Sequence, residues 1–118
     1  MKKVTKIIIY ILVTFLIIYN VTVAIQRIIA PNEVPSFFGY KNFVILSGSM
    51  EDTLNIGDII FVKDRNDIKE NDIISFKEKS SIITHRAIEV IDKEGETFYK
   101  TKGDANEAID TELISKGE

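Results

Sequence analysis

A serine that directly follows an apolar segment is the first residue whose type and position suit catalysis. Ser47, Gly48 and Ser49 come after the apolar run 43–46. A serine at a strand end, beside a flexible glycine, can be exposed at the rim of a sheet and act as a nucleophile. Its own amide can then face the developing oxyanion, and the Ser47 hydroxyl is a candidate second donor. Most serines in such places only form turns, so this segment alone does not identify a catalytic site.

His85, the single histidine of the chain, is the candidate base for such a serine. An imidazole changes its charge near neutral pH and can therefore accept the proton of a hydroxyl. Asp104 and Asp110 are candidates to orient the ring and to stabilise its protonated form. Each of these residues also has an ordinary structural interpretation, because lone histidines often lie in strands and aspartates near Gly103 often form turns.

Composition excludes several other kinds of site. The chain has no cysteine and one histidine, so thiol nucleophiles, zinc-thiolate sites and multi-histidine metal centres are excluded. We expect no metal and no cofactor. Residues after position 30 hold 11 of the 15 basic residues and all 18 acidic ones, a net charge of −7. No basic patch able to neutralise phosphates can form, so nucleic acid is excluded as a partner.

An apolar run near the N-terminus predicts one membrane span. Residues 7–25 contain one strongly polar residue, Asn20. As a helix they would cover roughly 28 Å, close to the hydrocarbon thickness of a bilayer. Lysines precede the run, which favours a cytoplasmic N-terminus. A cleavable signal peptide is the alternative, but its apolar core is shorter and residues 21–24 offer no clean small-x-small cleavage site. A buried helix is disfavoured, since few residues remain to cover it.

Short strands are predicted in the rest of the chain. Pro31 and Pro35 bracket a connector that ends the helix. The apolar segments beyond it are rich in β-branched and aromatic residues and are bounded by turn residues or charges. The expected fold class is mainly β, a small sheet or partial barrel preceded by one transmembrane helix. The predicted strands are 43–46, 59–62, 72–76, 82–91 and 97–100.

Two parts of the chain are therefore expected. Residues 1–30 would form a cytoplasmic tip and a transmembrane anchor. Residues 31–118 would form an extracytoplasmic β domain that carries the candidate site.

Five segments, taken in order, resemble the boxes of the type I signal peptidase family. The first, SGSMEDTL, resembles a nucleophile box usually written S-x-S-M-x-P-T-L. Threonine, histidine and arginine in succession match the box in which one branch of the family carries histidine. That branch includes the catalytic subunit of the eukaryotic signal peptidase complex, archaeal enzymes and some enzymes of Gram-positive spore formers. The resembling segments are 47–54, 55–62, 72–76, 84–86 and 102–106 followed by Asp110.

The resemblance implies a serine endopeptidase that removes signal peptides from secreted preproteins. It implies Ser49 as nucleophile, His85 as general base and Asp110 as the residue that orients the histidine. Asp104 would support the same acidic box, and Ser47 would contribute to the oxyanion hole. Such enzymes prefer small residues one and three positions before the cut. The residues expected to bind an extended substrate are Phe43, Val44, Ile45, Ile82 and Ile83.

The implied partners are the lipid bilayer, the signal-peptide-bearing preproteins and the secretion machinery. The implied location is the cell membrane, or the endoplasmic reticulum membrane of a eukaryote, with the N-terminus cytoplasmic and the catalytic domain extracytoplasmic.

Two departures from the family pattern leave an alternative open. Asp52 occupies the position of the usual proline, so we expect a less stiff turn after the nucleophile. Family members also continue beyond the last acidic box, so the sequence is expected to be C-terminally truncated. Both features suit a catalytically impaired, membrane-anchored β module that binds exported proteins or a partner subunit.

A third interpretation is a self-cleaving regulator of the repressor type. It would need an N-terminal DNA-binding domain, but the apolar run lies there.

Overall fold

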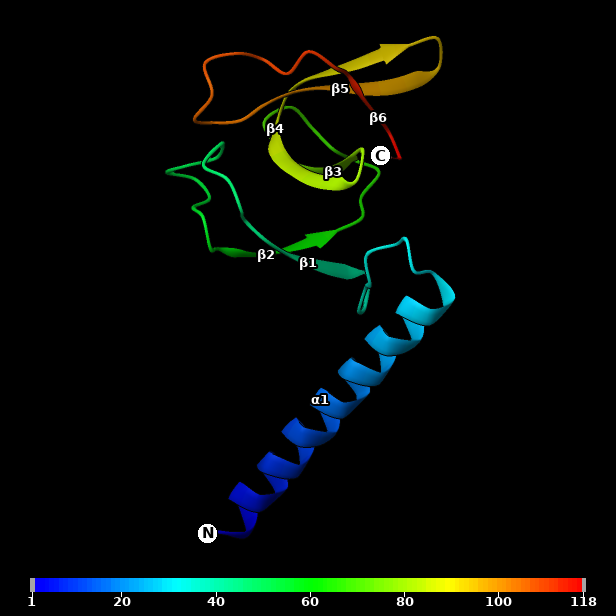
Figure 1. The fold of residues 1–118 in the computed structure, drawn as a ribbon, viewed down its shortest axis with the longest axis vertical. Helices are drawn as coiled ribbons and strands as arrows, with labels where there is room; N and C mark the ends of the chain where they lie inside the picture. Colours follow the sequence, from blue (N-terminus) through cyan, green and yellow to red (C-terminus); the bar gives the residue numbers. More distant parts are fainter. Residues whose placement is uncertain (1, 118) are drawn as a thin grey trace. The chain divides into compact units, whose positions relative to one another are not determined.

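The structure is a computed structural model that describes residues 2–117. One long helix precedes a body built from six strands (Figure 1). The predicted fold class, mainly β with one N-terminal apolar helix, is therefore confirmed. The chain separates into two compact units, Met1–Asn42 and Phe43–Glu118.

The first unit is dominated by helix α1, Lys3–Ile29. The helix is long and apolar enough to cross a membrane, and none of its described residues is buried. It extends beyond the predicted run 7–25 at both ends, because lysines and Gln26 are compatible with terminal helical turns. It ends where Pro31 prevents continuation, and the Ala30 amide closes the last turn on the Gln26 carbonyl at 2.8 Å.

Polar side chains within α1 bond to the helix itself. The Asn20 amide donates to the Leu16 carbonyl and the Thr22 hydroxyl to the Ile18 carbonyl, each at 2.8 Å. These bonds satisfy the polar groups inside the helix, so the apolar run tolerates them in a lipid environment.

The strands form two antiparallel arrangements. β1 (Tyr40–Val44) and β2 (Ile59–Lys63) make a two-stranded sheet. The other sheet has four strands in the order β3-β4-β5-β6. Their bounds are β3 Ile73–Glu78, β4 Ser81–Lys93, β5 Glu96–Lys102 and β6 Ile114–Ser115.

All five predicted strands are present, with shifted ends, and one strand was not predicted. β1 begins three residues before the predicted start, at Tyr40, and ends at Val44 rather than Leu46. β6 has two residues and lies between turns, so no periodic pattern of apolar residues could predict it.

The long strand β4 links the site to the core. Its register with β5 shifts between Ala87 and Glu89, which marks a bulge. A bulge bends a strand and increases its twist, and in Figure 1 β4 curves as it passes from β3 to β5. The sheet therefore curls into part of a barrel. Side chains alternate along β4, so that His85 and Ala87 are both buried on one face.

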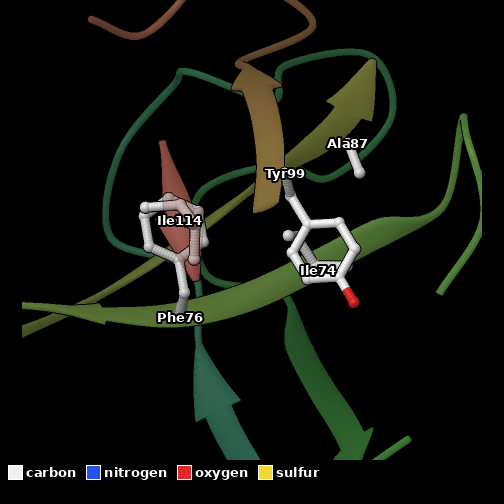
Figure 2. Close-up of a cluster of buried hydrophobic side chains, with 5 residues drawn as sticks. All are labelled: Ile74, Phe76, Ala87, Tyr99 and Ile114. Atoms are coloured by element: carbon white, nitrogen blue, oxygen red, sulfur yellow. The ribbon is translucent and has the colours of Figure 1, made fainter. Parts of the chain in front are cut away.

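The core lies on one face of this curled sheet. Ile74 and Phe76 come from β3, Ala87 from β4, Tyr99 from β5 and Ile114 from β6 (Figure 2). The unpredicted strand β6 therefore forms because Ile114, 8% exposed, completes this cluster.

Candidate active site

His85 and Asp110 meet at the end of the core. His85 Nδ1 lies 2.6 Å from Asp110 Oδ2. Because an ionised carboxylate can only accept, Nδ1 carries the proton and Nε2 is the unprotonated nitrogen of the neutral ring. This is the tautomer that a general base needs for its Nε2 to receive a proton.

Thr101 holds the carboxylate from the other side. Its side chain is fully buried, and its hydroxyl donates to Asp110 Oδ2 at 2.6 Å. The Asp110 amide also donates to the Thr101 carbonyl at 2.9 Å. Asp110 is therefore fixed by backbone and side chain, and the oxygen that faces His85 cannot easily turn away.

The sheet register explains how these groups meet. His85 pairs with Ile74 of β3, and Ala87, two residues further along β4, pairs with Thr101 of β5. Residues two apart in a strand share a face, so His85 and Ala87 lie on the same side of the sheet. Thr101, the partner of Ala87, therefore lies on that side as well. The loop that begins at residue 103 turns back toward β5, and this brings Asp110 to Thr101.

His85 is buried but keeps one nitrogen accessible. The residue is 8% exposed. Its Nε2 makes no hydrogen bond within residues 2–117. Every side-chain nitrogen or oxygen that is fully buried in this range has a hydrogen-bond partner, so Nε2 is not fully buried. Nε2 therefore reaches solvent and can meet an incoming group.

Ser49 lies in a turn that follows β1. Ile45 closes the end of the β1–β2 pair, because its amide donates to Asp58 at 2.9 Å and its carbonyl accepts from Gly57 at 2.8 Å. The next residues form tight turns, with Leu54 bonded back to Met50 at 2.7 Å.

The loop that leads to Asp110 also holds this turn. The Ala105 amide donates to the Ser49 carbonyl at 2.9 Å, and the Asp104 amide contacts the sulfur of the buried Met50 at 3.2 Å. A Cβ added at Gly103 would lie 2.5 Å from the Ser49 carbonyl oxygen, so only glycine allows this approach.

The hydroxyls of Ser47 and Ser49 face each other, with 3.3 Å between their oxygens. The Ser49 amide donates no hydrogen bond within residues 2–117 and so is available to another acceptor. No hydrogen bond in this range joins Ser49 to His85. The structure therefore joins His85 to Asp110 directly, whereas Ser49 is joined to them through the loop 103–110.

Asp104 makes a separate cluster with Arg86 and Thr53. Arg86 donates from Nε and Nη2 to the two carboxylate oxygens at 2.9 and 2.7 Å, and the Thr53 hydroxyl donates at 2.7 Å. The Arg86 and Thr53 hydrogen bonds lower the pKa of Asp104 to about 2. Asp104 does not contact His85 but ties β4 and the loop 103–110 to the turn after Ser49.

The residues expected to bind substrate lie on two strands. Phe43 is partly buried in β1, and Val44 is 53% exposed. Ile45 is 8% exposed, and both of its backbone groups are bonded. Ile82 and Ile83 pair with β3 only, since the pairing of β4 with β5 begins at Arg86. The first part of β4 therefore has an unpaired edge within the described residues.

Asp52 adopts a backbone conformation closed to the proline of the family pattern. Its φ is +73°, whereas proline is fixed near −65°. Aspartate is among the residues that tolerate this left-handed region, and the Asp52 amide is held by the Asn55 side chain at 3.2 Å. The turn thus has its own stabilisation in place of the proline.

Sequence reasoning missed Thr101 as part of the site, and it placed Thr53 in the nucleophile box without predicting its hydrogen bond to Asp104. Thr101 lies in an ordinary strand pattern, and no local signal tells a buried hydroxyl with an acidic partner from one facing solvent. Its position two residues before Gly103, next to the candidate acidic box, was the available hint. Among residues 2–117, no three histidine, aspartate or glutamate side chains converge to hold a metal ion.

Comparison with known proteins gives consistent matches. Residues 2–102 match the family model for signal peptidase, peptidase S26. Signal peptidase I W of Bacillus subtilis is 34% identical over 119 residues, covering 98% of this chain and 62% of the relative. The signal peptidase complex catalytic subunit SEC11 of Verticillium alfalfae is 38% identical over 80 residues, covering 64% and 46%. SEC11C of Canis lupus familiaris is 40% identical over 80 residues, covering 64% and 42%.

The chain spans about half the length of most of these curated relatives and 62% of the Bacillus subtilis protein. The family-model match ends before Asp104 and Asp110. No solved structure matches the chain significantly.

Proposed function

The chain belongs to the signal peptidase family, peptidase S26, and on this premise we propose that it is a membrane-bound serine endopeptidase that removes signal peptides from secreted preproteins. The observation that carries the proposal is the His85–Asp110 pair at 2.6 Å, next to a loop that also bonds the Ser49 backbone. A buried, oriented imidazole with one accessible nitrogen is the arrangement that a serine nucleophile requires.

The chemistry follows from the atoms of this site. His85 Nε2 accepts the proton of the Ser49 hydroxyl while Oγ attacks the scissile carbonyl carbon. The imidazolium that forms is stabilised by Asp110, and its proton then passes to the leaving amine. Water, deprotonated by the same imidazole, cleaves the acyl-enzyme and restores Ser49.

Ser49 must turn from Ser47 toward His85 for the first step. A change of the χ1 rotamer moves only the hydroxyl and leaves the turn in place. Catalytic hydrogen bonds of free enzymes often form only when substrate is bound, so the 3.3 Å contact between the two serines suits a resting state. Once Ser49 has turned, the Ser47 hydroxyl and the Ser49 amide remain to stabilise the oxyanion.

The substrate would lie as an extended strand between the β1 end and the first part of β4. Val44 offers an exposed apolar side chain, and Ile82 and Ile83 lie on an unpaired edge. Main-chain pairing at such an edge gives affinity, while alternate side chains enter pockets and give specificity. Ile45 contributes packing only, since its backbone groups are already bonded.

Helix α1 would anchor the enzyme in the membrane that holds the signal segment of the substrate. The lysines before the apolar run favour a cytoplasmic N-terminus and an extracytoplasmic catalytic unit. Sharing one bilayer raises the effective concentration of the cleavage site without further contacts. The names of the SEC11 relatives describe catalytic subunits of a signal peptidase complex. An association of this chain with the secretion machinery is part of the proposal.

The test is cleavage of a preprotein with an Ala-x-Ala site by the purified full chain in detergent or vesicles. Ser49→Ala, His85→Ala and the double variant each lower kcat by a similar factor, on the order of a million, because the residues act as one unit. Ser80→Ala, in the exposed turn after β3, is the matched control and keeps wild-type kcat. If the kcat of the double variant fell by the product of the two single factors, Ser49 and His85 would act independently, and the proposal would be contradicted.

A catalytically impaired module that binds exported proteins is the second candidate. The observation that favours it is the missing hydrogen bond between Ser49 and His85. It predicts saturable binding of preprotein with no cleavage, and no effect of Ser49→Ala on binding. The same purified chain and substrate therefore separate the two functions.

A further inference from the structure

Met50, the residue after Ser49, is buried without belonging to the apolar core. Its side chain is 1% exposed, and among residues 2–117 the largest fully buried side chains are Met50 and Thr101. The core cluster shown in Figure 2 is built from residues of β3 to β6 and does not include Met50. Burial of this side chain therefore has another origin, and its sulfur contacts the loop 103–110.

The Met50 sulfur is a hydrogen-bond acceptor for this loop. The Asp104 amide donates to Sδ at 3.2 Å, and within residues 2–117 it donates to no other atom. A thioether sulfur is a weak acceptor, but a hydrocarbon side chain offers no acceptor at all. Leucine would fill much of the same volume and would leave the Asp104 amide without a partner, which costs free energy.

Two successive amides of the loop bond to two successive residues of the turn that carries the nucleophile. The Asp104 amide donates to the Met50 sulfur, and the Ala105 amide donates to the Ser49 carbonyl at 2.9 Å. The Thr53 hydroxyl adds a third bond, to the Asp104 carboxylate at 2.7 Å. Because Met50 is buried and directly follows Ser49, its sulfur fixes the turn from the inside, next to the candidate nucleophile.

We propose that Met50 is a positioning residue, whose sulfur holds the nucleophile turn in place against the loop that carries Asp110. This loop ends at the carboxylate that orients His85. A shift of the turn relative to the loop is therefore a shift of Ser49 relative to His85, and the sulfur contact restricts it. The inference rests on the proposed function. It deepens that function because it assigns the effect to one sulfur atom rather than to the apolar bulk of the side chain.

Methionine analogues test the sulfur atom with little change of side-chain shape. The chain contains two methionines, Met1 and Met50. The full chain is produced with methionine, with selenomethionine, or with norleucine, in which a methylene group replaces the sulfur. Selenium keeps an acceptor at this position, whereas norleucine removes it. A Met50→Leu chain produced with methionine or with norleucine is the matched control, because its two forms differ only at position 1.

Kinetics and hydrogen exchange are measured on each form. Steady-state cleavage of a short peptide with an Ala-x-Ala site gives kcat and KM. Hydrogen exchange of the Asp104 amide, followed by NMR, reports the sulfur contact whether or not the protein cleaves the peptide. We expect norleucine to lower kcat about tenfold at unchanged KM and to speed exchange of this amide severalfold. The selenomethionine form stays within about twofold of the methionine form in both measurements.

A norleucine form with the kcat of the methionine form would overturn the positioning role. Equal losses of kcat in the norleucine and selenomethionine forms, or a difference between the two Met50→Leu forms, would overturn the role of the sulfur. Faster exchange throughout the core strands, including the Ala87 amide, would show general destabilisation and would also overturn it. Absence of cleavage by the methionine form, with faster Asp104 exchange in the norleucine form, would overturn the proposed function while supporting the sulfur contact.

Discussion

Gly103→Ala tests whether the loop 103–110 positions the nucleophile. The added Cβ would lie 2.5 Å from the Ser49 carbonyl oxygen, whereas ordinary contact begins near 3.4 Å. Relief of the clash therefore requires a displacement of about 0.9 Å. The Asn106 side chain, 2.6 Å from the same point, can rotate away, but the Ser49 oxygen belongs to the backbone. The Ser49 turn must move or lose its 2.9 Å bond from Ala105.

The magnitude follows from this displacement. A misplacement of a reacting group by about 1 Å costs on the order of a hundredfold in rate. We expect Gly103→Ala to lower kcat about a hundredfold, with a smaller change in KM because the strands expected to hold substrate do not move. Overpacking of this kind destabilises by about 1–3 kcal/mol, so the variant remains folded if the wild type has ordinary stability.

Gly48→Ala is the matched control, since Gly48 directly precedes the nucleophile. The nearest atom to its added Cβ is a Glu51 carboxylate oxygen at 3.5 Å, so alanine fits without displacement. The assay is steady-state cleavage of a short peptide with an Ala-x-Ala site, together with thermal unfolding of each variant. A Gly103→Ala enzyme with kcat similar to that of Gly48→Ala would refute the positioning role of the loop.

Three further predictions follow from the same contacts. Thr101→Val removes the hydroxyl that donates to Asp110, so kcat falls about tenfold at constant KM and Thr101→Ser restores it, as measured by steady-state kinetics. Asp52→Pro lowers both the melting temperature and kcat, because proline cannot adopt the φ of +73°, whereas Asp52→Gly leaves both near wild type. Asp104, whose pKa is lowered to about 2 chiefly by Arg86, stabilises the folded state at neutral pH and loses this contribution as the pH falls from about 4 to about 2. The free energy of unfolding of Asp104→Asn, measured with urea, is therefore about 1 kcal/mol below that of wild type at pH 7, after allowance for partial exposure. The two free energies become equal as the pH falls from about 4 to about 2.

Much of the fold could be predicted from local patterns. The apolar run 7–25 identified α1, and strings of β-branched residues identified five of the six strands. These signals work because a lipid-facing helix and a half-buried strand each impose a residue pattern along the sequence. β6 could not be found in this way, since its two residues pair with β5 only because Ile114 completes the core.

The candidate site could be predicted only in part, because some of its contacts depend on tertiary packing and leave no local pattern. The family boxes named His85 and Asp110, and the structure brings them to 2.6 Å. The role of Thr101 depends on the register between β4 and β5, which no local pattern specifies. The left-handed conformation of Asp52 was also invisible, because aspartate occurs in many turn types.

The central claim, that one imidazole activates one hydroxyl, is tested most directly by an acylating probe of serine peptidases and mass spectrometry of the labelled chain. The account predicts a covalent adduct on Ser49 of the folded wild-type protein, and strongly slowed labelling of His85→Ala at the same pH. Labelling of Ser49 at an equal rate in both proteins, or of another residue in its place, would contradict it.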